Sequence, residues 1–148
     1  MLALLIPTVL AFVLKVYLSS VEISPYVTYT VEETINARGY SYEKHNVTTD
    51  DGYILTIFRI LGEKSGGHPV LMIPAVKHSA HSFIMNMGTK APGFTLTDAG
   101  YDVWLGNVRG NYMSREHLTL DPSSDEYWDF TIEEIAEIDI PTFIKYIK

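Results

Sequence analysis

Serine and histidine lie close together at two places in this 148-residue chain, and such pairs can carry nucleophilic catalysis. His78 and Ser82 are four residues apart, and Ser114 and His117 are three apart. A histidine that hydrogen-bonds to a serine can remove its proton and so activate it. His78 and His81 also have a spacing that metal ligands use. Since scattered histidines in loops are usually solvated, we expect neither a catalytic pair nor a metal site here.

The composition is typical of a globular protein and excludes some classes of binding partner and site. Hydrophobic residues make up 47% of the chain and charged residues 20%. Acidic residues outnumber basic ones by 18 to 11, which gives a formal net charge of -7. An acidic chain repels phosphate backbones, so a nucleic-acid partner is not expected. The absence of cysteine excludes disulfides, thiolate metal sites and a cysteine nucleophile.

The N-terminus has the pattern of a targeting segment. Residues 1–14 are almost entirely apolar, and Lys15 interrupts the run. The run is shorter than the ~20 residues that a membrane span needs, but it fits the apolar part of a secretory signal peptide. The sequence therefore predicts a signal peptide over residues 1–20, with transient membrane contact, and a mature part over residues 21–148. An uncleaved signal anchor is the alternative.

A single N-x-[ST] sequon occurs at Asn46-Val47-Thr48. Asparagine in such a sequon is an acceptor of N-linked glycans when the chain enters the secretory pathway. Together with the signal peptide, the sequon predicts glycosylation at Asn46 and a secreted or lysosomal location. The signal anchor would instead leave the protein attached to a membrane.

The first elements are a helix and a β-hairpin. Thr30 and Glu33 form a capping-box pattern, and the helix that follows is expected to end before Gly39. Residues 41–49 and 53–60 are rich in strand-forming types and flank an Asp-Asp-Gly turn. Both faces of the second strand are largely apolar, so we expect it to be covered on both sides.

The rest of the chain alternates strands and helices. We expect a buried central strand over residues 70–73, a helix over 92–99, a strand over 101–105, and a glycine-bracketed turn that Arg109 braces without a catalytic role. A helix beginning at a second capping box, Thr131 to Glu134, is expected to restart with Asp139 as its N-cap. Both tryptophans are expected in the core. This order predicts an α/β sheet, mostly parallel after the hairpin.

Several longer motifs carry a family resemblance. Residues 47–55, 98–107 and 109–117, followed by 125–128 and 139–141, resemble the acid lipases in order and with nearly matching spacing. This family comprises gastric and lysosomal lipases and insect digestive relatives. The resemblance implies a secreted or lysosomal α/β-hydrolase that acts on neutral lipid esters with a Ser-His-Asp triad. It implies no metal and no cofactor, and its partners would be a neutral lipid ester or a lipid surface.

The serine nucleophile of an α/β-hydrolase lies in a G-x-S-x-G turn, and this chain contains no such motif. This chain reaches a helix that ends near Lys148. In the family, the G-x-S-x-G turn comes just after the corresponding helix, and the acid and histidine of the triad follow later. We therefore expect an incomplete α/β-hydrolase fold: the hairpin, central strands and flanking helices, without the nucleophile elbow and the C-terminal half. No residue of this chain is predicted to be catalytic.

The one remaining candidate lies where the family binds the oxyanion. After the first buried strand the family carries His-Gly-Leu, and here Ala75-Val76-Lys77 stands in that place. Lys77 could offer its backbone N–H by position, but the glycine that allows close approach to substrate is absent. We therefore regard Lys77 as a degenerate oxyanion position.

Two functions fit these observations. The first is an acid-lipase-like protein of neutral lipid metabolism that is inactive as a 148-residue chain because the triad is absent. The alternative is a non-catalytic remnant or a lipid-binding or interaction module, which the loss of His-Gly-Leu favours. The codons downstream of position 148 distinguish a fragmentary gene model from a truncated protein.

Overall fold

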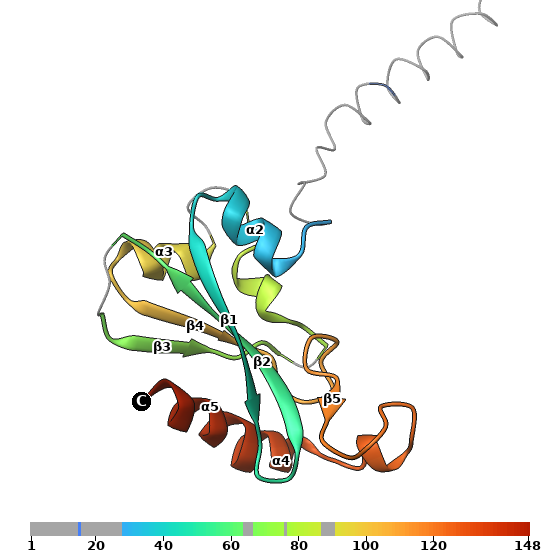
Figure 1. Cartoon of the computed structure of the whole chain (residues 1–148). Coiled ribbons are helices and arrows are strands. Elements are labelled where there is room, and N and C mark those ends of the chain that lie inside the picture. Colours follow the sequence, from blue (N-terminus) through green and yellow to red (C-terminus); the bar gives the residue numbers. More distant parts are fainter. Residues whose placement is uncertain (1–14, 16–27, 64–66, 76, 87–90) are drawn as a thin grey trace, which may run out of the picture.

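The computed structural model describes residue 15 and residues 28–63, 67–75, 77–86 and 91–148. A twisted sheet with helices on both faces forms the body of the protein (Figure 1). In chain order the elements are α2 (Val31–Ala37), β1 (Ser41–Thr48), β2 (Tyr53–Leu61), β3 (Pro69–Met72), η2 (Ala80–Phe83), α3 (Pro92–Asp98), β4 (Asp102–Gly106), β5 (Glu116–His117), η4 (Glu126–Trp128), α4 (Ile132–Glu134), η5 (Ile135–Asp139) and α5 (Ile140–Ile147).

The helix and hairpin predicted near the start are confirmed. Thr30 Oγ1 accepts a hydrogen bond from the Glu33 backbone N–H at 3.1 Å, and a Glu33 carboxylate oxygen accepts one from the Thr30 N–H at 2.8 Å. Gly39 follows the helix with a φ of 82°, a left-handed conformation that glycine adopts without strain. β1 and β2 then pair antiparallel over their whole shared length.

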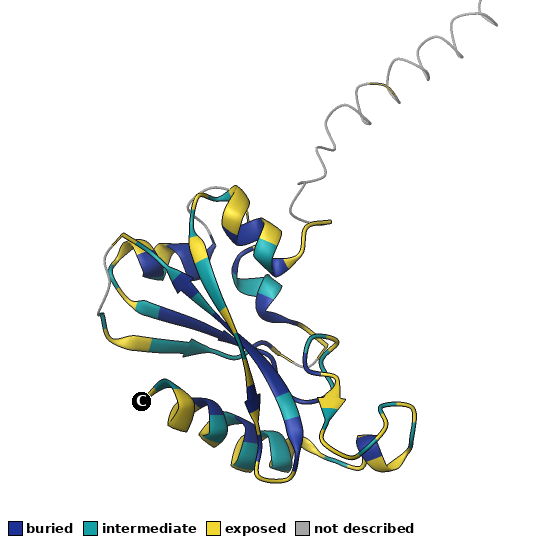
Figure 2. Ribbon diagram, in the orientation of Figure 1, coloured by how far each residue is buried: buried dark blue, intermediate teal, exposed yellow. Residues whose placement is uncertain are grey.

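The sheet order is β1-β2-β4-β3, with the short strand β5 also paired to β2. The predicted parallel arrangement holds only for β3 and β4, because β4 lies antiparallel beside β2. The prediction that residues 70–73 form a buried central strand is wrong in the described part of the chain. There β3 is an edge strand, and its residues are half-buried or exposed (Figure 2).

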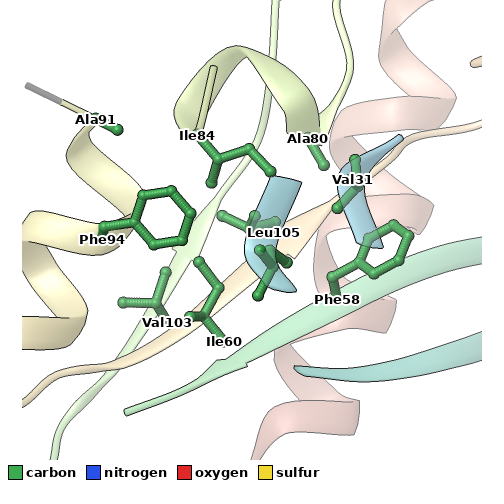
Figure 3. Packing of buried hydrophobic residues seen from close by; sticks show 10 residues of the cluster. Val31, Phe58, Ile60, Ala80, Ile84, Ala91, Phe94, Val103 and Leu105 are labelled. Atoms are coloured by element: carbon green, nitrogen blue, oxygen red, sulfur yellow. The ribbon is translucent and has the colours of Figure 1, made fainter. Parts of the chain in front are cut away.

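Two hydrophobic clusters cover β2 on both faces, as expected from its apolar pattern. Phe58 and Ile60 pack with α2, α3 and η2 on one face, together with Val103 and Leu105 of β4 (Figure 3). On the other face, β2 contributes Tyr53, Leu55 and Ile57 to a cluster with Val47, Trp104, Tyr127 and Phe143. Alternation along each strand therefore divides the core into two halves.

The C-terminal helix α5 begins at Ile140 with Asp139 in the N-cap position and Pro141 in its first turn, as expected, but no break in the helix precedes it. The chain passes from α4 through a π-helical turn, η5, directly into α5. Asp139 has helical backbone angles and makes no capping hydrogen bond, because its fully buried carboxylate binds Arg109 instead. The expectation that both tryptophans are buried holds only for Trp104, since Trp128 is 42% exposed.

Candidate functional site

The parallel pair β3 and β4 directs two loops to the same end of the sheet. Open α/β sheets bind ligands in the crevice outside the carboxyl ends of such strands. A cavity of about 710 Å³ lies here, between residues 73–75, 77 and 78 after β3 and residues 108–112 after β4. Its volume is within the range of small-molecule sites, which is roughly 300–1,000 Å³.

The cavity wall is mainly apolar. Ile73 and Val108 contribute from the strand ends, and the first turns of the C-terminal helix lie opposite them. The other apolar lining residues are Pro74, Ala75, Trp128, Phe130, Ile132, Ile135, Ala136 and Ile140. Such a wall is suited to hydrocarbon, because burying apolar surface is favourable whatever its orientation.

Lys77 and His78 are the polar lining residues that follow β3. Lys77 is exposed. Its φ of 68° lies in the left-handed region of backbone conformation, which residues other than glycine and asparagine seldom adopt. The amide of Asn111 donates a hydrogen bond of 2.6 Å to the His78 carbonyl oxygen, which ties the loop after β3 to the loop after β4. The structure therefore places the predicted oxyanion residue, Lys77, at the cavity.

Arg109 connects the cavity to the core. Its guanidinium donates to both Asp51 carboxylate oxygens, at 2.6 and 3.0 Å, and through Nε to Asp139 at 2.8 Å. The Arg109 backbone N–H donates to the second Asp139 oxygen, also at 2.8 Å. The guanidinium carbon also lies 4.1 Å from the Tyr53 ring centroid. Arg109 thus links the hairpin turn, the loop after β4 and the C-terminal helix, which confirms its expected bracing role.

The two carboxylates around Arg109 respond differently to their surroundings. At Asp51, burial acts to raise the pKa, but hydrogen bonds from Arg109 and Thr49 outweigh it and hold the pKa below its usual value. At Asp139, burial is the dominant influence and raises the pKa, against the hydrogen bonds from Arg109. Asp51 is one-third exposed whereas Asp139 is fully buried, which explains the difference.

The histidines after β3 have separate partners. His78 Nδ1 lies 3.2 Å from Ser82 Oγ in an exposed contact within one turn. His81 points elsewhere, with Nε2 at 3.0 Å from Thr34 Oγ1 in α2, and burial lowers its pKa. Among the described residues no group of three or more potential ligand side chains gathers in a way that could hold a metal ion.

Ser114 and His117 have structural contacts. The buried Ser114 hydroxyl donates to the Asn107 carbonyl oxygen at 2.6 Å and accepts from the Thr56 N–H at 2.8 Å. His117 Nδ1 accepts from two successive backbone N–H groups, and Nε2 contacts the Asp51 carbonyl oxygen at 2.9 Å. The structure does not bring the serine and the histidine into a catalytic pair.

The remaining predicted features lie away from the cavity. Asn46 is exposed on β1, where its Oδ1 accepts a hydrogen bond from Thr56 Oγ1 at 3.1 Å. The predicted signal peptide lies almost entirely outside the described residues. In the described part of the chain, no helix combines the length and apolar character needed to cross a membrane.

Sequence reasoning missed the partners of Arg109 and most of the cavity wall. Asp51 and Asp139 lie 58 and 30 residues from Arg109, so no local pattern connects them. From the sequence, Asp51 is expected only as a turn residue and Asp139 only as a helix cap. The glycine-bracketed turn around Arg109 was the one signal of a constrained backbone in this region.

Comparison with known proteins supports the resemblance found in the sequence. A family model described as "Partial alpha/beta-hydrolase lipase region" matches residues 31–87. Lipase member K of Homo sapiens is 43% identical over 130 residues, which cover 84% of this chain and 33% of that protein. Gastric triacylglycerol lipase of Bos taurus is 41% identical over 137 residues, 88% of this chain and 34% of that protein.

An insect relative shows the same partial coverage. Lipase 1 of Drosophila melanogaster is 42% identical over 120 residues, 81% of this chain and 27% of that protein. The chain thus spans about a third of the length of these curated relatives. By this homology the chain belongs to the acid lipase family, of which it covers the N-terminal third.

Proposed function

We propose that the chain is an acid-lipase-like protein of neutral lipid metabolism. In the form of these 148 residues, we propose that it does not hydrolyse esters. Homology to gastric triacylglycerol lipase supports the lipid class. The apolar cavity at the carboxyl ends of β3 and β4 supports the place where lipid would bind. The observation that carries the proposed inactivity is the absence of a G-x-S-x-G segment from the sequence.

The residues around the cavity provide only part of an ester-hydrolysing site. Acyl transfer by serine needs an activated nucleophile, a histidine base, an acid and an oxyanion hole. Lys77 could direct one backbone N–H toward an oxyanion, and one such donor lowers a barrier by roughly 3–4 kcal/mol. Ser82 contacts His78, but no carboxylate among the described residues forms an ion pair with that imidazole. Without an orienting acid, this exposed pair is not proposed as a nucleophile.

The secretory features belong to the same proposal. A signal peptide over residues 1–20 would direct the chain to a secreted or lysosomal location, and Asn46 would carry a glycan. The exposure of Asn46 supports access by the glycosylation machinery. Expression in a secretory cell line, followed by N-terminal sequencing and treatment with a glycan-removing amidase, tests both features. A mature N-terminus near Val21 and a mass loss that is absent from Asn46→Gln would support them.

The activity proposal is tested with the full chain and p-nitrophenyl butyrate, a short-chain ester that soluble esterases accept. We expect release of nitrophenol at the rate of buffer alone. Turnover above buffer that a serine-reactive phosphonate abolishes would contradict the proposed inactivity. A Ser82→Ala variant would then show whether the His78 contact is responsible.

A second candidate is a non-catalytic lipid-binding module. The specific observation in its favour is an apolar cavity whose lining includes Trp128 and Ile132, exposed by 42% and 68%. Sequencing the transcript beyond codon 148 separates the two candidates. An in-frame G-x-S-x-G segment within the next few dozen codons would favour a lipase gene, and a stop codon would favour the binding module.

A further inference from the structure

We propose that the cavity after β3 and β4 binds a long-chain carboxylic acid, with its alkyl chain against the apolar wall and its carboxylate near Lys77. This inference rests on the proposed lipid-handling function and names the ligand class of the same site. It differs from that proposal in predicting recognition of an anionic amphiphile rather than of a neutral ester.

The shape and chemistry of the cavity suit an alkyl chain. Its volume of about 710 Å³ is that of a site for one small molecule. Ile73, Phe130, Ile135 and Ile140 line it with hydrocarbon from a strand end, a loop and the C-terminal helix. Burial of each added methylene would tighten binding about fourfold until the cavity is filled.

The charges around the cavity suit a carboxylate. The formal charge of the chain is -7, yet no aspartate or glutamate among the described residues lines this cavity. The lining does include Lys77, His78 and Arg109. Arg109 is already occupied by two carboxylates, so it is not available to a ligand. Lys77 is exposed and forms no ion pair with the residues that the structure describes, so its ammonium group can meet an anion.

One molecule of amphiphile fits this arrangement better than a lipid surface does. An anionic membrane is attracted by clusters of four or more basic side chains. The cavity offers a single uncompensated lysine beside a hydrophobic space, which matches one carboxylate on one alkyl chain. A neutral ester or alcohol would use the apolar wall but would gain nothing from the charge of Lys77.

The test is saturable binding of laurate to the full chain, measured calorimetrically below the micelle concentration at neutral pH. Dodecanol serves as the probe with the same chain and no carboxylate. The variants are Lys77→Gln, which removes the charge, and Ala136→Trp, which fills the cavity from an exposed lining position. Lys145→Gln is the matched control, because Lys145 lies on α5 and does not line this cavity.

We expect laurate to bind at one site, about three- to tenfold more weakly to Lys77→Gln and without change to Lys145→Gln. Dodecanol should bind Lys77→Gln and the unaltered chain equally, and Ala136→Trp should abolish both. Absence of saturable laurate binding, or equal laurate affinity of Lys77→Gln and the unaltered chain, would overturn the proposal. Ester hydrolysis is measured separately, so failure of the proposed inactivity would not be confused with failure of this binding site.

Discussion

Arg109 shows how one buried charge is compatible with a hydrophobic core. Its side chain is only 1% exposed, and isolated burial of such a charge would be very unfavourable. Two carboxylates, Asp51 and Asp139, accept its hydrogen bonds, and the Tyr53 ring lies against its face. The fixed planar fork of arginine can satisfy both partners at once, which lysine could not do.

Replacing Arg109 with methionine should therefore reduce stability strongly. The variant keeps most of the side-chain volume but leaves the fully buried Asp139 without its counter-charge. Loss of one partner from a buried ion pair costs about 3–5 kcal/mol of unfolding free energy. Urea denaturation measures the change, with Arg115→Met as control because Arg115 is exposed. A loss of less than 1 kcal/mol in Arg109→Met would contradict this account of the ion pair.

Asp51 gives a prediction for pH dependence. Since its pKa is lower in the folded protein than in the unfolded chain, it stabilises the fold above the usual aspartate range. This contribution is lost as the pH falls through the lowered pKa. Asp51→Asn should therefore show a shallower fall in stability below about pH 4 than the unaltered chain. Parallel pH profiles from thermal melts would contradict the assigned role.

Individual residues could be predicted only where their role depends on near neighbours. The Thr30 cap and the turn position of Asp51 follow from spacings of a few residues, and both are confirmed. The pairing of Arg109 with Asp139 depends on tertiary structure, so sequence spacing assigned Asp139 to a helix cap instead. The resemblance to the acid lipases points to Lys77, which stands in the place of the family's His-Gly-Leu, but a positive φ cannot be predicted for a lysine.

At the scale of elements, two buried side chains, Asp139 and Phe143, position the C-terminal helix. The π-helical turn η5 precedes α5 and places Asp139 toward Arg109. Phe143, one turn later, is fully buried between the helix and the sheet, whereas Ile144 is 42% exposed. Hydrophobic spacing predicted a single apolar stripe containing both residues, but successive positions are about 100° apart around a helix, and here only Phe143 faces the sheet.

Phe143→Ala should consequently detach or loosen α5. Truncation of a fully buried phenylalanine costs about 3–5 kcal/mol, and the neighbouring Ile144→Ala should cost less than about 1 kcal/mol. Equilibrium unfolding of the two variants measures this contrast. Similar losses in both would mean that α5 does not pack on the sheet with the face seen here.

At the scale of the whole molecule, the layered α/β class was predictable and the strand order was not. Alternating strands and helices indicated the class, and the two-sided burial of β2 is confirmed. The apolar run at residues 70–73 resembled a central strand, since composition reports burial but not the number of neighbouring strands. In the described part of the chain, β3 pairs on one side only, with β4.

The exposed edge of β3, as seen in the described part of the chain, predicts that residues 21–148 self-associate in solution. Exposed edges of apolar strands pair with other chains, and charged residues, lysine above all, block such pairing. We expect sedimentation to show oligomers that increase with concentration, and Val70→Lys to shift the population toward monomer. Val70 is half-buried, so the substitution is tolerable. A strictly monomeric unaltered protein with a cooperative melt would contradict the prediction.

The claim most central to this account is that the chain has the lipase framework without an activated serine. Incubation of the full chain with a fluorophosphonate, followed by intact mass spectrometry, tests it directly, with an active serine hydrolase as positive control. We predict an unchanged mass for the chain and a stoichiometric adduct on the control. A single phosphonate adduct on one serine, formed by the folded chain but not by a chain denatured before incubation, would contradict the account.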